Sequence, residues 1–376
     1  MKTAVLNKIV VSLTLLFLLL MLTATHAVAA SSDPVKAKKE AEAKGYIFFA
    51  THDEIVAMAK KEGKLRVMIG LEPQTSKPLM NAFKQKYPFI TDLHVQEISG
   101  TEAYQRVLLE MKSGQAMEWD IVHLPLDFAK AYMPYLMKHE ILGMAKHGVL
   151  KIDPRMVHPG ERNIIGVIST VKVVPYNRKL ISEDKVPAQW EDFLKPEFKG
   201  RKFLMDIRPI ELGALVPAWG LERTLDFARK IAAQQPVWAR GATRYTTAIA
   251  AGEYSFAASI NFSVLKQIMS KDPTGNLSYK TIEPVPTRAI DDGNGILNTA
   301  SHPHAALLWF EFLASPEGQE IIDKYELEAS VFTPGSVHEQ VTRGKKLSLV
   351  DWDHVTKFEE YVKKISAAQG FPKAEK

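Results

Sequence analysis

The stretch THDEIVAMAKKEGKLRVMIG, residues 51–70, places a helix signal directly before a strand signal. Thr51 and Glu54 have the spacing of a capping box at a helix start, and Gly63 occupies the position where glycine commonly ends a helix. Branched apolar residues then recur at every second position, as in a half-buried strand. We therefore expect a helix that ends near Gly63 and a strand over 65–69.

The same alternation of strands and helices continues along the chain. Further strands are predicted over 93–98, 120–124, 164–174, 203–206 and 254–260. Further helices are predicted over 221–233, 246–251 and 305–312. Such alternation favours an α/β fold with a mostly parallel sheet flanked by helices. With ~150 residues per domain, a chain of 376 residues has the length of about two such lobes.

The N-terminus has the order of a secretory signal peptide. Lys2 and Lys8 precede an apolar run over 9–22, and Ala27-Val28-Ala29 supplies a small-x-small cleavage site. The apolar run is shorter than the ~20 residues that a membrane span needs, which favours cleavage over a retained anchor. We expect residues 1–30 to be removed, with cleavage near Ala29/Ala30, and the mature protein to be periplasmic.

Composition excludes several other classes of protein. The chain contains no cysteine, so a lipid anchor on a thiol, disulfides and thiolate metal sites are excluded. The net charge is +5 and falls to about +3 once the two N-terminal lysines are removed. The charges are interspersed, and no block of Lys and Arg indicates a nucleic-acid surface.

Four stretches carry a resemblance to a known family, and they occur in that family's order. They are Pro175–Asn177 with Val186–Leu194, Pro196–Arg201, Ala251–Tyr254 and Ser301–Gln319. Together they resemble the extracellular solute-binding proteins of ABC importers, in the family 1-like branch that includes binders of ferric iron, thiamine and polyamines. Each motif alone is weak, and the resemblance rests on all four in sequence, over roughly residues 63–335.

The resemblance implies a two-lobed fold of the type II periplasmic binding proteins, hinged by crossover strands. The expected division is a lead over 31–62, lobe 1 over 63–160, lobe 2 over 161–280, a return to lobe 1 over 281–335 and a helical tail over 336–376. It also implies a monomer without cofactor that captures a small solute between the lobes. The expected partner is an ABC permease in the inner membrane.

Candidate binding residues lie in loops that follow predicted strands, because ligands of open α/β lobes bind outside the carboxyl ends of strands. These loops supply free N–H groups at helix starts and polar side chains. The candidates are Gln74, Thr75, Ser76, Ser99, Gly100, Thr101, Asn261 and Ser263. Each Ser or Thr could equally be only an N-cap of its helix. Tyr176 is a further candidate by the resemblance, and its alternative role is a half-buried core tyrosine.

Arginines in the predicted second lobe suggest an anionic solute. Arg208 directly follows a predicted strand end and is the first candidate, with Arg240 next. A guanidinium binds carboxylate or phosphonate through two parallel hydrogen bonds, although a surface arginine is usually only solvated. We therefore expect a small carboxylate, phosphonate or sulfonate, without a metal site.

Ferric iron is the alternative ligand that the resemblance suggests. Iron binders of the branch place adjacent tyrosines after the strand that follows the Ala251–Tyr254 motif. Here Phe262 and Ser263 stand in that place. Ferric iron is hard and prefers anionic oxygen donors, which phenylalanine does not supply.

Two other functions are weighed against solute capture for import. A periplasmic enzyme would need catalytic residues, and the chain has no G-x-S-x-G elbow, H-E-x-x-H, Walker loop or G-x-G-x-x-G. We therefore expect no enzyme and no catalytic residues. A sensor that presents the solute to a membrane kinase or chemoreceptor would share the same lobes, and the sequence does not separate it from a transport receptor.

Overall fold

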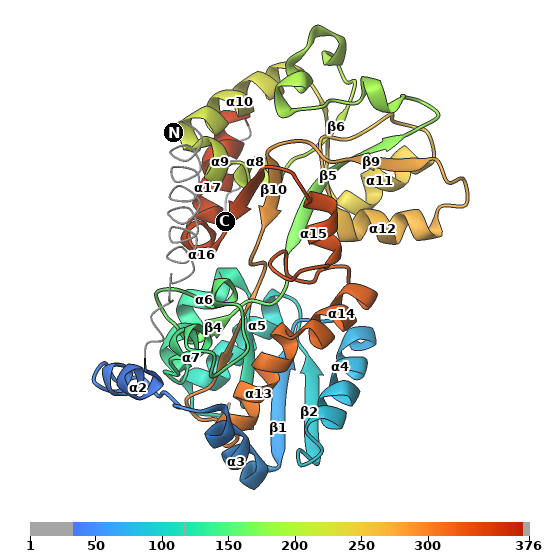
Figure 1. Cartoon of the computed structure of the whole chain (residues 1–376). Helices are drawn as coiled ribbons and strands as arrows, with labels where there is room; N and C mark the ends of the chain where they lie inside the picture. Colours follow the sequence, from blue (N-terminus) through green and yellow to red (C-terminus); the bar gives the residue numbers. More distant parts are fainter. Residues whose placement is uncertain (1–32, 116–117, 371–376) are drawn as a thin grey trace, which may run out of the picture.

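The computed structural model describes residues 33–115 and 118–370, so the predicted signal peptide lies outside the described residues. The chain forms two lobes, one above the other in Figure 1, each with its own sheet and covering helices. The expected two-lobed α/β fold is confirmed, but both sheets are mixed rather than mostly parallel. The reason is that strands which return from the other lobe pair antiparallel with their neighbours.

The sheet of lobe 1 has the strand order β2-β1-β3-β11-β4. Its strands are β1 (Lys64–Ile69), β2 (Asp92–Glu97), β3 (Ile121–Leu124), β4 (Ile164–Ile165) and β11 (Gly293–Ile296). The first three are parallel, whereas β11 runs antiparallel to both β3 and β4. The helices of this lobe are α3 (His52–Glu62), α4 (Pro73–Lys86), α5 (Thr101–Lys112), α6 (Leu126–Tyr132), α7 (Ile141–Lys146), α13 (Pro303–Ala314) and α14 (Pro316–Tyr325). A preceding helix, α2 (Pro34–Glu42), and two 3-10 turns, η1 (Met133–Tyr135) and η2 (Pro154–Met156), complete it.

The sheet of lobe 2 has the order β12-β10-β5-β8, and β9 also pairs with β5. Its strands are β5 (Thr170–Asn177), β8 (Ile260–Asn261), β9 (Leu277–Lys280), β10 (Val285–Arg288) and β12 (Leu347–Val350), beside a parallel pair of β6 (Leu204–Asp206) and β7 (Val237–Ala239). Its helices are α8 (Ile210–Gly213), α9 (Val216–Trp219), α10 (Leu221–Ala233), α11 (Ala242–Ala250), α12 (Phe262–Lys271), α15 (Val337–Thr342), α16 (Trp352–Val355) and α17 (Phe358–Ala368). Three 3-10 turns are η3 (Glu183–Lys185), η4 (Trp190–Leu194) and η5 (Pro196–Phe198).

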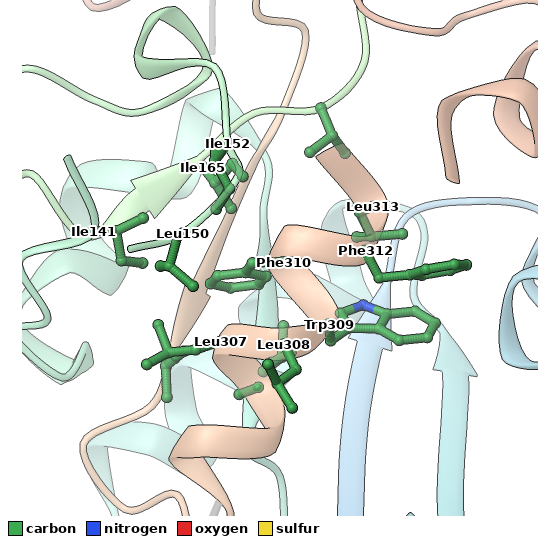
Figure 2. Packing of buried hydrophobic residues seen from close by; sticks show 14 of the residues in the cluster. Ile141, Leu150, Ile152, Ile165, Leu307, Leu308, Trp309, Phe310, Phe312 and Leu313 are labelled. Carbon is green, nitrogen blue, oxygen red and sulfur yellow. The ribbon is translucent and has the colours of Figure 1, made fainter. Parts of the chain in front are cut away.

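Helix α13 forms the centre of the lobe 1 core. Nearly all of its side chains are buried, which fits its apolar composition on every face. Figure 2 shows Phe310 on the side of Ile141 and Leu150, with Trp309 and Phe312 on the opposite side. There the Trp309 ring packs edge-on against Phe83 of α4, with 5.0 Å between ring centroids. Helix α13 therefore packs between the segment that holds Ile141 and Leu150 and helix α4.

Most of the expected elements are present, with shifted ends. The capping box of Thr51 and Glu54 is formed, and Gly63 ends α3 in the left-handed conformation. The expected strand over 254–260 was wrong over most of its length, since only Ile260 and the following Asn261 form a strand. Residues there are buried, but they make isolated bridges instead of a continuous ladder.

The C-terminal segment differs from the exposed helical tail expected over 336–376. Its strand β12 pairs in parallel with β10 as the edge of the lobe 2 sheet. Helix α17 then packs along α10 and α8. Phe358 and Ile365 of α17 are buried, so this segment is part of lobe 2.

Three chain segments cross between the lobes, and a buried serine joins them. They are residues 166–169, 289–292 and 326–336, which link β4 to β5, β10 to β11 and α14 to α15. The Ser169 hydroxyl donates to the carbonyl of Ala289 at 2.7 Å and accepts from the N–H of Val331 at 3.0 Å. Gly166 is needed at this approach, because a Cβ there would lie 2.6 Å from the Ile290 side chain.

Gln319 of α14 ties the same crossings to lobe 1. Its side-chain amide donates to the carbonyls of Val167 at 3.0 Å and Leu313 at 2.8 Å. Its carbonyl oxygen accepts from the Ser330 N–H at 2.7 Å and the Thr333 hydroxyl at 3.1 Å. The buried amide thus uses both donors and both acceptor positions.

Replacing Gln319 with leucine is expected to lower the free energy of unfolding by about 3 kcal/mol or more. Three buried backbone groups would lose a partner, and each such group costs about 1–3 kcal/mol. Urea unfolding of the full chain measures the change. Gln267→Leu, at an exposed position of α12, is the control and should stay within about 0.5 kcal/mol of the wild type. A Gln319→Leu loss no larger than that of the control would contradict this role.

His338 is expected to make the protein sensitive to acid. It is buried, its Nδ1 donates to the Ala329 carbonyl, and burial lowers its pKa to about 4. Because this folded pKa lies below the unfolded value of about 6.5, its contribution to stability is present above pH 6.5 and is lost as the pH falls towards 4.

The His338→Asn variant keeps a donor but cannot become charged. It should be less stable than the wild type at pH 7.5 because a cavity forms, and the difference should narrow between pH 6.5 and 4. Urea unfolding across this range measures it, with His94→Asn at an exposed site as the control. A difference that does not depend on pH would refute the assignment.

Candidate functional site

A cleft of about 530 Å³ lies between the lobes, over the crossing segments. It is lined by Gly70, His123, Pro125, Ile168, Thr170, Lys172, Asp206, Arg208, Ile210, Glu211, Ala242, Tyr245, Asn261, Arg288, Asp291, Asp292, Glu328, Phe358 and Glu359. The size suits a small solute. The lining residues come from both lobes and from all three crossings, so a bound molecule would contact every part that moves when the lobes close.

Lobe 1 contributes a compact wall in which His123 of β3 is the ionisable group among the described side chains. The imidazole lies directly over Gly70, at the end of β1, where a Cβ would be 2.4 Å from the ring. Its Nδ1 lies 3.3 Å from a carboxylate oxygen of Asp292. The glycine therefore leaves the space that lets His123 reach a residue of the crossing segments.

Lobe 2 contributes a buried acid and a base near each other. Lys172 points into the cleft from β5, and Glu211 lies in α8. Burial raises the pKa of Glu211 to about 7, and the charge of Lys172 opposes that rise. Burial also lowers the pKa of Lys172, with Glu211 acting in the opposite direction. Each group thus offsets part of the other's charge.

The crossing segments contribute three carboxylates to the cleft floor. Asp291 pairs with Arg288 at 2.7 Å, and Asp292 pairs with His123. Glu328 accepts a hydrogen bond from the Ser263 hydroxyl at 2.9 Å. Burial raises the pKa of Glu328 to about 8, and repulsion from the two aspartates adds to the effect.

Taken together, the cleft is rich in acids. Among the side chains that the structure describes, six carboxylates line it, against three bases and one histidine. Burial raises the pKa values of Glu211, Asp292 and Glu328, so ionising these three groups without a cation is unfavourable. Within the described residues, Oε1 of Glu211 and Oδ1 of Asp292 are buried without a hydrogen-bond partner.

Two of the sequence-predicted site residues line this cleft. Arg208 follows the end of β6, and Asn261 ends β8. The amide oxygen of Asn261 is buried without a partner among residues 33–115 and 118–370. Ser263 does not line the cleft, but it hydrogen-bonds Glu328, which does.

The other predicted residues lie elsewhere. The exposed ones are Gln74, Ser99, Gly100, Thr101 and Arg240. Thr75 is buried and donates to Glu326 at 2.8 Å, while Ser76 bonds the Pro73 carbonyl within its own helix. Tyr176 belongs to the core of lobe 2, and its hydroxyl bonds Glu183.

Sequence reasoning missed most of the charged residues in the cleft. Lys172 interrupts the β-branched run of β5, and a charge inside such a run is a signal of a special environment. Asp291 and Asp292 stand beside a glycine between two strands, a pattern that also describes an ordinary turn. Glu328 carries no local signal, because only the fold brings it to Asp292.

No preformed metal site is present in the described part of the chain. No group of three or more His, Asp and Glu side chains is arranged to hold an ion there. Phe262 is buried against Tyr279. The Tyr245 hydroxyl, the phenol in the cleft lining, donates to the Ser259 carbonyl at 2.8 Å, and burial raises the pKa of this phenol above its ordinary value.

No helix of residues 33–115 or 118–370 combines the length and apolarity of a membrane span.

Comparison with solved structures shows the fold. Iron-bound HitA from Pseudomonas aeruginosa has a TM-score of 0.59 and 18% identity, covering 81% of this chain and 99% of its own. The ferric iron-binding protein A of Mannheimia haemolytica, in an open conformation, has a TM-score of 0.63 and 16% identity, with 81% and 98% covered. A GABA receptor has a TM-score of 0.59 and 18% identity, with 83% and 99% covered.

Comparison with sequences shows the family. No curated protein sequence matches the chain significantly. A family profile described as bacterial extracellular solute-binding protein matches residues 124–357, which is more than half of the chain. With the interlobe cleft described above, this match shows that the chain belongs to the bacterial extracellular solute-binding proteins, a family that binds small solutes for ABC importers and catalyses no reaction on them.

Proposed function

We propose that this protein captures a small organic solute with a protonated amine and delivers it to an inner-membrane ABC permease. The observation that carries this proposal is the excess of carboxylates over bases in the cleft. A protonated amine supplies positive charge and three N–H donors. It would therefore stabilise the ionised form of acids whose pKa values burial now raises.

The cleft also supports a carboxylate on the same solute. Arg208 is exposed at the cleft wall and has no ion-pair partner within the described residues, so its guanidinium is available to an anionic group. Arg288 is already paired with Asp291. An amine and a carboxylate on one small molecule fit this distribution, with Asn261 as a further polar contact.

This proposal revises the purely anionic solute expected from the sequence. That expectation rested on arginines of the second lobe, of which Arg208 and Arg288 line the cleft. Arg240 and Arg244 are exposed and lie outside the cleft lining. The ionised acids of this lining would repel a solute that carries only negative charge.

Ferric iron is the second candidate. Several of the similar structures are ferric-binding proteins, and carboxylate oxygens are hard donors that suit ferric iron. The acid-rich cleft also fits a metal cation. We rank iron second because the described residues hold no preformed metal-binding group and the Tyr245 phenol is already engaged.

Capture requires that the solute binds the closed form better than the open form. Two lobes joined by three crossings can close by hinge bending, and only a difference in affinity between the two forms drives that closure. In the cleft a solute would touch Gly70 and His123 of lobe 1 together with residues of lobe 2, and opening of the lobes would separate these contacts. These contacts supply the required difference.

A thermal-shift series on the mature protein separates the candidates. Four probes share a four-carbon chain: butyrate, butylamine, 4-aminobutyrate and 1,4-diaminobutane. Ferric citrate is the fifth. The amine-bearing probes are expected to stabilise the protein, by about 2.7 kcal/mol at a concentration one hundred times Kd, whereas butyrate should not.

The same series contains the contrary outcomes. Stabilisation by butyrate alone would restore the anionic solute and refute the amine. Stabilisation by ferric citrate alone would establish the iron candidate instead. Isothermal titration with the stabilising probe then gives its affinity.

A further inference from the structure

Asp291, Asp292 and Glu328 form a cluster at the cleft floor, called here the hinge acid cluster. The two aspartates lie in the crossing between β10 and β11, and Glu328 lies in the crossing that follows α14. The electrostatic coupling of Glu328 to both aspartates places the three carboxyl groups in one region of the cleft. Residues far apart in the sequence therefore meet where the lobes are joined.

The cluster has fewer counterions than carboxylates. Arg288 neutralises Asp291. Asp292 has His123 beside it and, through a weaker electrostatic influence, the Arg288 that pairs with Asp291. One of its carboxylate oxygens has no partner among the described residues, although the residue as a whole is only 7% exposed. Glu328 has the Ser263 hydroxyl and no cationic partner in the same residues. The described floor of the cleft therefore offers these two neighbouring acids less positive charge than they would need to ionise together.

The acids of lobe 2 are better balanced. Lys172 acts electrostatically on both Glu211 and Asp206. A backbone N–H of Arg208 also donates to Asp206 at 2.9 Å. A positive group of the solute gains more at Asp292 and Glu328. Among the described residues Glu328 has no cationic partner, and the bases near Asp292 are His123 and Arg288, of which Arg288 is already paired with Asp291.

We propose that the hinge acid cluster is the subsite that receives the ammonium group of the solute, between Asp292 and Glu328. This inference rests on the function proposed above and names the residues that select the amine. The ammonium group donates to the unpartnered oxygen of Asp292 and to Glu328. Its carboxylate end, where present, then extends towards Arg208.

Position on the crossings gives the subsite a second effect. Glu328 leads into Ala329, which bridges to Ile168, and the Ser169 N–H donates to the Glu328 carbonyl at 3.0 Å. Asp291 donates its N–H to the Ile168 carbonyl at 3.2 Å. An ammonium group bound here bridges acids of two crossings, so it holds together the segments about which the lobes bend.

Binding at this subsite displaces a proton. The acid of Glu328 faces Asp291, Asp292 and Glu326 and receives the Ser263 hydroxyl, and its pKa of about 8 leaves it mostly protonated at pH 7. The ammonium group replaces that proton as the positive partner. Amine affinity should therefore rise with pH between 6 and 8, by up to about tenfold per unit.

The test measures Kd by calorimetry for 4-aminobutyrate and 1,4-diaminobutane on the mature full chain. Asp292→Asn and Glu328→Gln keep the side-chain size and remove the charge, and each is expected to weaken amine binding at least tenfold. Glu328→Gln should also abolish the rise of affinity with pH. Glu320→Gln, an exposed site on α14 outside the cleft, is the matched control and should stay within twofold.

Each result decides one proposal. If both amines bind the wild type but affinity is unchanged in Asp292→Asn and Glu328→Gln, the subsite is wrong while the proposed function stands. The subsite is also wrong, and the proposed function still stands, if Glu211→Gln alone weakens binding, because the amine would then bind at lobe 2. If neither amine binds the wild type, the proposed function fails and the subsite with it. Thermal unfolding of each variant shows whether it is still folded. If Asp292→Asn does not fold, the Glu328→Gln variant still tests the subsite.

Discussion

The three crossings between the lobes depend on buried hydrogen bonds to two side chains, Ser169 and Gln319. The serine joins all three crossings, and the glutamine amide fixes two of them to the end of α13. Both side chains are buried, so water does not compete for these bonds. The lobes can thus bend about the three crossings while these hydrogen bonds keep the crossings in a fixed arrangement. The cleft floor keeps its shape because its residues belong to these same segments.

Local signals predicted the architecture well where they were self-contained. The helix start at Thr51, the stop at Gly63 and the strand β1 depend on neighbours in sequence, and all three appear in the structure, although the second half of β1 is buried on both faces. The mixed sheets could not be predicted this way, because β11 enters lobe 1 only after the chain has passed through most of lobe 2. The strand that was wrongly predicted over 254–260 has a related cause. Its burial arises from tertiary packing around Phe256 and not from a continuous ladder.

The candidate site was predicted only in part, for a comparable reason. Arg208 and Asn261 could be found because each follows a strand, and strand ends of such lobes face the cleft. Thr75 met the same rule but lies outside the cleft lining, where it bonds Glu326 at the start of the third crossing. The acids of the floor lie on crossings rather than at strand ends. No spacing in the sequence connects Asp292 with Glu328, and only the folded chain brings them together.

The shared position of the floor acids and the bending segments constrains how this receptor can be altered. In a biosensor design, the usual aim is to change ligand choice while keeping the stiffness of the joint. Here Asp292 and Glu328 contribute to both properties. Substitutions at the cleft floor would therefore change the stiffness of the crossing segments together with ligand selectivity. Rim residues such as Arg208 and Glu359 lie on lobe 2 and away from the crossings. They are the positions at which selectivity can be changed without altering the mechanics of closure.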